Sequence, residues 1–123
     1  MRIVEWEKGV HRSVSRKVLE VIRRVILEEA EKLGVSVERI VLFGSRARGD
    51  YREDSDYDIL VVVRNKLSRK VKIDLSVNIS SRLIDEIHAP VDVIVVSETS
   101  WRKYRSAPGT VLYSAGKEGV LVA

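Results

Sequence analysis

Three aspartates stand at the starts of two apolar runs, where carboxylates from neighbouring strands could meet. Asp56 and Asp58 open the run at residues 59–63, and Asp92 is the one charged residue of residues 91–96. Side chains two residues apart in a strand share a face, so Asp56 and Asp58 are expected about 6–7 Å apart. Carboxylates this close repel one another unless a cation lies between them. Carboxylate oxygens bind Mg²⁺ or Mn²⁺, and pairs of such ions promote in-line phosphoryl displacement.

Asp92 supports this interpretation because an unpartnered carboxylate buried in an apolar strand is costly. We therefore predict that Asp92 lies beside Asp56 and Asp58, on a neighbouring strand. Each aspartate also has an ordinary explanation: Asp56 as a turn residue, Asp58 at a strand edge, and Asp92 in an ion pair with an arginine. Taken together, the three favour a metal site.

A glycine–serine pair, Gly44-Ser45, follows the apolar run at residues 40–43 and precedes a predicted single helical turn at residues 46–48. Glycine lets the backbone approach a ligand closely, and the N–H groups of the turn, with the serine hydroxyl, can hold a phosphate. Arg46 and Arg48 either only solvate the turn or neutralise a bound triphosphate. The segment lacks the lysine of a Walker A loop, which argues against a P-loop ATPase.

Two long helices are predicted to support these strands. Apolar residues recur every three or four positions over residues 10–33 and 69–88, the pattern of amphipathic helices that end at Gly34 and before Pro90. Short helices are expected at residues 101–104 and 111–115, followed by a closing apolar segment at 119–122. The order helix, strand, strand, helix, strand predicts an α+β fold, an α/β sandwich with one mixed sheet, and a single domain over residues 1–123.

The composition excludes several other classes of protein. There are no cysteines and only two histidines, so disulfide scaffolds, thiol catalysis and zinc–cysteine sites are ruled out. The net charge of +4 suits a phosphate-bearing ligand, but it is too small to argue for direct nucleic-acid binding. No apolar run approaches the length of a membrane span and no signal peptide is evident, so a cytoplasmic location is expected.

A family resemblance rests on the order of these motifs. In GSRARGDYREDSDYD, ten residues separate Gly44-Ser45 from the Asp-x-Asp pair, SDYDILVVV continues as the strand, and the single aspartate of VDVIVV follows. In these features the chain resembles the nucleotidyltransferase fold of the DNA polymerase beta superfamily, and within it the minimal nucleotidyltransferase (MNT) group. ISSRLIDEI and GKEGVLVA resemble the group's later helix and closing strand, so the resemblance extends over nearly the whole chain.

The resemblance implies a role for each motif. Gly44 and Ser45 would hold the triphosphate of ATP, Asp56 and Asp58 would bind two Mg²⁺ ions (or Mn²⁺), and Asp92 would help bind metal and activate the attacking hydroxyl. The implied reaction transfers AMP from ATP to a hydroxyl and releases pyrophosphate. MNT proteins are paired with HEPN-domain toxins, so the implied function is an antitoxin that AMPylates a tyrosine of the toxin.

Two alternatives remain open at the level of the sequence. A non-catalytic antitoxin could neutralise its partner by occlusion, although such a protein has no reason to keep three mutually repelling acids. A nucleotidyltransferase for a small molecule such as an antibiotic is disfavoured because no residues remain for a substrate domain. Four aromatic residues are expected to pack at the edge of the domain: Trp6, Trp101, Tyr104 and Tyr113. An exposed strand or an exposed aromatic edge would support a homo- or hetero-oligomer.

Overall fold

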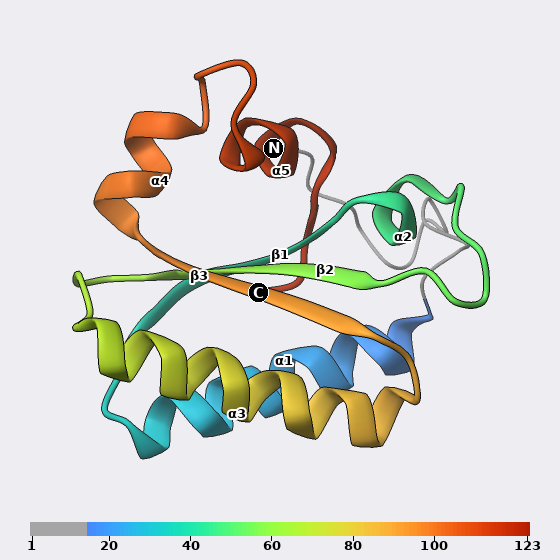
Figure 1. Ribbon diagram of the computed structural model, residues 1–123, viewed down its shortest axis with the longest axis horizontal. Helices are drawn as coiled ribbons and strands as arrows, with labels where there is room; N and C mark the ends of the chain where they lie inside the picture. Colours follow the sequence, from blue (N-terminus) through green and yellow to red (C-terminus); the bar gives the residue numbers. More distant parts are fainter. Residues whose placement is uncertain (1–14) are drawn as a thin grey trace.

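One four-stranded sheet lies between two layers of helices in the computed structural model, which describes residues 15–123 (Figure 1). The long helices α1 and α3 cover one face, and the short helices α4 and α5 lie over the other. In chain order the elements are α1 (Arg16–Lys32), β1 (Val37–Phe43), α2 (Ser45–Arg48), β2 (Tyr57–Val63), α3 (Arg69–Ile87), β3 (Val91–Ser97), α4 (Glu98–Tyr104), α5 (Val111–Glu118) and β4 (Val120–Leu121). The predicted α+β fold with a mixed sheet is confirmed.

The strand order is β3-β2-β1-β4, which makes β3 an edge strand. β2 is antiparallel to β1 and parallel to β3, and β4 pairs antiparallel with β1. α3 is the crossover that parallel strands require. In the β2–β3 register, Asp58 is the partner of Asp92, while on the other side of β2 Phe43 is the partner of Asp58. The end of β1 and the starts of β2 and β3 therefore meet at one place.

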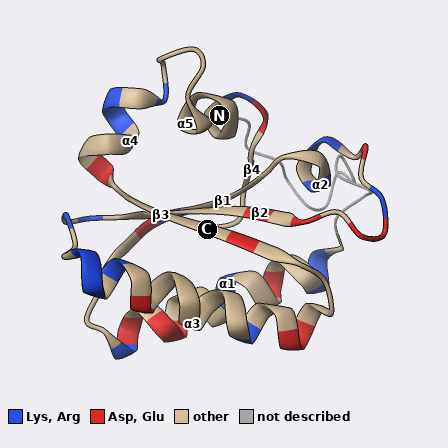
Figure 2. Ribbon diagram, viewed as in Figure 1, with Lys and Arg blue, Asp and Glu red and all other residues tan. Residues whose placement is uncertain are grey.

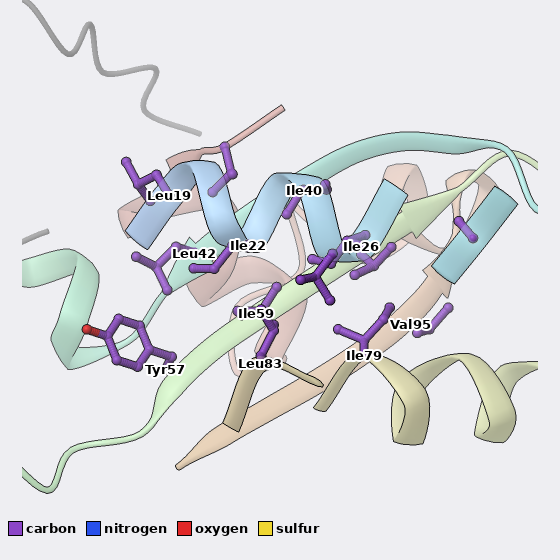
Figure 3. Packing of buried hydrophobic residues seen from close by; sticks show 14 of the residues in the cluster. Leu19, Ile22, Ile26, Ile40, Leu42, Tyr57, Ile59, Ile79, Leu83 and Val95 are labelled. Atoms are coloured by element: carbon purple, nitrogen blue, oxygen red, sulfur yellow. The ribbon is translucent and has the colours of Figure 1, made fainter. Parts of the chain in front are cut away.

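The larger core lies between the sheet and helices α1 and α3. It includes alternate residues of β2 (Tyr57, Ile59, Val61, Val63) together with apolar residues of both helices (Figure 3). Both helices begin at a serine N-cap: Ser15 accepts a hydrogen bond from the N–H of Val18 at 3.1 Å, and Ser68 accepts one from Val71 at 3.3 Å. This packing fixes which face of β2 is turned toward the long helices.

The smaller core lies on the opposite face, beneath α4 and α5. It contains the other alternate residues of β2, Leu60 and Val62, with Trp101 fully buried among them. Ile94 and Val96 of β3 pack against the same cluster. Trp101 was expected at the edge of the domain, whereas it lies at the centre of this second core; Trp6 falls outside the described residues.

The predicted elements are recovered with shifted ends. The second long helix ends at Ile87, as expected, while the first is described from Arg16, and residues 10–14 of its predicted span lie outside the described residues. The strands are longer than their apolar runs, because β1 includes Glu38 and Arg39 at its exposed beginning. No helix among the described residues is long and apolar enough to cross a membrane.

Candidate active site

Asp58 and Asp92 project from adjacent strands on the same face of the sheet. They are register partners in the parallel β2–β3 pair, and neighbouring strands lie about 5 Å apart. Side chains alternate along a strand, so Asp58 shares the face of Leu60 and Val62, and Asp92 that of Ile94 and Val96. Both carboxylates therefore lie on the α4/α5 face, at the end of the sheet where these two strands begin.

The three aspartates differ in their surroundings. Asp58 is partly buried, whereas Asp56, one residue before β2 begins, is exposed. Asp92 is exposed, so it is not the buried carboxylate that its apolar run suggested, although it is the register partner of Asp58 on the neighbouring strand. The reason is the strand order: β3 is an edge strand, and the first residues of an edge strand meet solvent even when the run is apolar.

The electrostatics single out Asp58 as a carboxylate that lacks compensation. Its partial burial raises its pKa above the ordinary aspartate value, and the negative charges of Asp92 and Asp56 raise the pKa further. The Arg48 guanidinium acts in the opposite direction with a smaller effect. A cation beside these carboxylates would relieve the repulsion.

Because Gly44 has no side chain, the Asp58 carboxylate can lie directly against its backbone. Its φ is 75°, in the left-handed region, and it joins β1 directly to α2. A Cβ at this position would collide with Oδ2 of Asp58 and lie 3.2 Å from its Cγ. The position therefore requires glycine for two reasons, its backbone conformation and the close approach of the carboxylate.

Divalent cations suit this set of donors. Within residues 15–123, no three acidic or histidine side chains form a group that could hold a metal ion as they stand. The fit rests instead on Asp58 and Asp92 sharing a face, on the raised pKa of Asp58, and on the space beside Gly44. Oxygen donors of this kind are the ligands that Mg²⁺ and Mn²⁺ take. Convergence of Asp56 on the same ions stays a prediction.

Arg46 is buried and braces the loop that leads to Asp56. Its guanidinium donates hydrogen bonds to the carbonyl oxygen of Ser55 at 3.1 and 3.2 Å and to that of Glu53 at 3.0 Å. It also lies between two aromatic rings, 4.3 Å from the Tyr51 centroid and 4.4 Å from the Tyr57 centroid. These contacts brace the protein's own loop, and contact of Arg46 with a nucleotide, one of the two roles considered for it, stays a prediction.

Arg48 is the more accessible of the two arginines. It forms ion pairs with Asp50 at 3.3 Å and with Glu118, at the end of α5, at 3.0 Å. The hydrogen bond with Asp50 raises the pKa of Arg48, so the side chain stays cationic. The positive charge of Arg48 also acts to lower the pKa of Asp58, so it is felt at the site.

Sequence reasoning missed the contacts that arrange the loop at residues 49–56. The brace of Arg46 between Tyr51 and Tyr57 could have been suspected from an arginine and two tyrosines within twelve residues. The residues of the Arg48–Glu118 pair are 70 positions apart, so no local sequence pattern indicates that they meet. The site therefore has a supporting layer that only the folded structure reveals.

Comparison with known proteins defines the class. The family model described as "Polymerase beta, Nucleotidyltransferase" matches residues 25–122, which include all three aspartates and the Gly44-Ser45 turn. The chain belongs to this nucleotidyltransferase family. The activity of this family is transfer of a nucleotidyl group, as the resemblance implied.

Three relatives bring the comparison closer. A protein of Methanocaldococcus jannaschii, provisionally named a protein adenylyltransferase, is 31% identical over 83 residues, covering 68% of this chain and 83% of the relative. A crystal structure of a provisionally assigned nucleotidyltransferase from Sulfolobus solfataricus is 30% identical, with a TM-score of 0.52 and coverage of 85% of this chain and 78% of that one. A toxin–antitoxin structure with AMP-PNP shares the fold at 23% identity, with a TM-score of 0.55 and coverage of 85% and 72%.

Proposed function

We propose that this protein is a Mg²⁺-dependent adenylyltransferase that moves AMP from ATP to a tyrosine hydroxyl of a HEPN-domain toxin and so acts as its antitoxin. The observation that carries the proposal is the pairing of Asp58 with Asp92 beside the Cβ-free space at Gly44. The M. jannaschii relative's name supports protein as the acceptor and adenylyl as the transferred group. The toxin–antitoxin neighbour with AMP-PNP has the same fold.

Each residue has a chemical role in this reaction. The Gly44-Ser45 turn offers backbone N–H groups and a hydroxyl to the triphosphate, and Arg48 offers a guanidinium that stays charged. Asp58, with Asp92 and Asp56, would hold the divalent ions. When bound, these ions neutralise the phosphates and the charge that develops on the departing pyrophosphate. Positioning and charge stabilisation supply most of the rate in such transfers.

The exposed position of Asp92 suits a group that meets the acceptor. The acceptor oxygen forms a bond to the α-phosphorus of ATP while the bond from that phosphorus to the β-phosphate bridge breaks and pyrophosphate leaves. The hydroxyl proton passes to a carboxylate, and Asp92, which is exposed and is the register partner of Asp58, can be reached by a docked protein. Asp58, partly buried between its neighbours, is better placed for the metal.

A mass measurement on the partner tests this proposal. The HEPN protein is incubated with this protein, ATP and Mg²⁺, and its intact mass is compared with samples that lack ATP or contain EDTA. We expect an increase of one or more AMP units on a tyrosine only in the complete mixture. A partner that is inhibited but keeps its mass would show that occlusion, the second candidate, is the mechanism.

A further inference from the structure

One edge of the sheet is open and apolar. β3 pairs with β2 on one side only, and after Asp92 its sequence to residue 96 is wholly apolar. Edge strands are usually protected by lysine, proline or a bulge, because their free N–H and C=O groups can pair with another strand. This edge has none of those protections between residues 93 and 96.

The exposed flank of α3 continues this apolar surface. Three branched residues are among the most exposed large apolar residues of the described part of the chain: Ile73 at 49%, Val77 at 57% and Ile84 at 44%. They recur at helical spacing, on the flank opposite the one where Arg82 binds Glu28 and Glu29 of α1. A groove of ≈ 440 Å³ joins this flank to the edge strand, lined by Ile73, Ser76 and residues 93–96 among others.

The spacing along α3 is self-complementary. In an isologous dimer the same patch is used twice, so residue i meets residue j and j meets i. A two-fold axis beside the middle of α3 would bring Ile73 of one copy to Ile84 of the other. The same axis would place Val77 of one copy opposite Ser80 of the other. It would also pass beside Ile94, the middle residue of β3, so that the two β3 strands run antiparallel.

The two ends of β3 carry opposite charges, which suits pairing with a second copy of this chain. At the end of β3, a cavity of ≈ 400 Å³ is lined by three lysines, Lys66, Lys72 and Lys103, none of which has an ion-pair partner among residues 15–123. At the beginning of β3 stands Asp92, exposed and also without an ion pair in the described part. Figure 2 shows the same contrast, with positive charge where α3 begins and negative charge near the start of β3.

We propose that β3 and the flank of α3 (Ile73, Val77, Ser80 and Ile84) form a homodimer interface, in which two β3 strands pair antiparallel into one continuous eight-stranded sheet. Antiparallel pairing sets the lysine-lined end of each β3 beside the Asp92 end of the other. The two-fold axis stands perpendicular to the sheet, so α4 of one copy, with Lys103, lies on the same face as Asp92 of the other. This interface goes beyond the proposed chemistry, and it uses the charge of Asp92, a residue to which the proposed function also gives a role.

Sedimentation equilibrium on the purified chain tests the interface directly. We expect a species of twice the 14.0 kDa chain mass at tens of micromolar. Val77→Lys places two like charges near the two-fold axis and should give a monomer. Val111→Lys is the matched control, because Val111 is 51% exposed but lies on α5, on the other face of the sheet.

The attraction between the lysines of one copy and Asp92 of the other is tested by measuring the dimer dissociation constant. Raising the salt from 50 to 500 mM should weaken the dimer several-fold by screening the lysine–Asp92 attraction, and Lys103→Glu should weaken it at low salt. A wild-type chain that stays monomeric, or a dimer that Val77→Lys leaves intact, overturns the interface. A dimer indifferent to both salt and Lys103→Glu overturns the antiparallel arrangement.

Discussion

The two sides of the sheet hold carboxylates in opposite electrostatic states. On the α1/α3 side, Glu29 is buried and accepts charged hydrogen bonds from Arg82 at 2.8 Å and Lys32 at 2.9 Å. The hydrogen bond from Arg82, followed by that from Lys32, lowers the pKa of Glu29. On the α4/α5 side, the pKa of Asp58 is raised by burial and by two neighbouring acids.

This difference separates stability from chemistry within one small sheet. The charge of Glu29 is satisfied by the protein itself, so the ion pair helps to join α1 to α3. The charge of Asp58 is left for a ligand to satisfy, and the side of the sheet that carries it is covered by helices of only seven and eight residues. Functional sites commonly keep such unfavourable charge arrangements, which the rest of the fold must stabilise.

Among Gly44→Ala, Arg46→Ala and Glu29→Gln, Gly44→Ala should reduce the rate of AMP transfer most. The new Cβ would collide with the Asp58 carboxylate, and displacing that group by about an ångström is expected to reduce AMP transfer roughly 100-fold. Gly109→Ala is the matched control: its φ of 87° imposes similar backbone strain, but nothing lies within 4 Å of the added Cβ. Transfer assays with labelled ATP measure both. Equal losses in the two variants would mean that backbone strain, and not the carboxylate contact, explains the glycine.

Removing the Arg46 side chain should loosen the loop that carries Asp56. Arg46→Ala deletes the hydrogen bonds to Ser55 and Glu53 and leaves their carbonyl oxygens without this donor. We expect a loss of roughly 1–3 kcal/mol in the free energy of unfolding, together with slower transfer. Arg46→Lys keeps the charge but not the planar fork, so it should recover only part of the loss. Urea denaturation measures the first effect, and a stability equal to wild type would refute the brace.

Neutralising Glu29 should weaken the α1/α3 side without affecting transfer. Glu29→Gln replaces two charge-assisted hydrogen bonds with weaker ones, at roughly 1–3 kcal/mol. Glu28→Gln, at an exposed ion pair, should cost at most about 1 kcal/mol. Because the folded-state pKa of Glu29 is lowered, its contribution exists above the ordinary glutamate pKa and is lost as the pH falls through the lowered value. Denaturation at pH 7 and near pH 3 should therefore give a smaller difference between Glu29→Gln and wild type at the lower pH.

The smallest expected effect is the change in stability on replacing Asp58. It is a gain in stability, whereas replacing Glu29 causes a loss. A raised folded-state pKa means that ionised Asp58 disfavours folding at neutral pH, and the penalty disappears below the ordinary aspartate pKa. Asp58→Asn should thus melt slightly higher than wild type at pH 7 and equally near pH 3. A variant that melts lower at pH 7 would show that Asp58 stabilises the fold.

The sequence predicted the parts of the site that depend on local order. Periodicity located both long helices, the apolar runs located the strands, and the motif order brought Gly44 and Asp58 together, whereas a place for Asp56 in the same site stays a prediction. The exposure of Asp92 could not be predicted, because an apolar run does not reveal whether its strand is central or at an edge. The contacts of Arg46 and the Arg48–Glu118 pair depend on tertiary packing, so helix and strand patterns do not encode them.

The most direct test of the account compares two aspartates of the same segment. Asp58→Asn and Asp54→Asn each remove one negative charge, but Asp54 is an exposed loop residue and Asp58 faces Gly44 and Asp92. With labelled ATP, Mg²⁺ and the HEPN partner, the account predicts that Asp58→Asn slows AMP transfer by about 10³-fold or more, equivalent to roughly 4 kcal/mol of lost transition-state stabilisation. Asp54→Asn should transfer AMP at the wild-type rate. Full transfer by a folded Asp58→Asn variant would contradict the account.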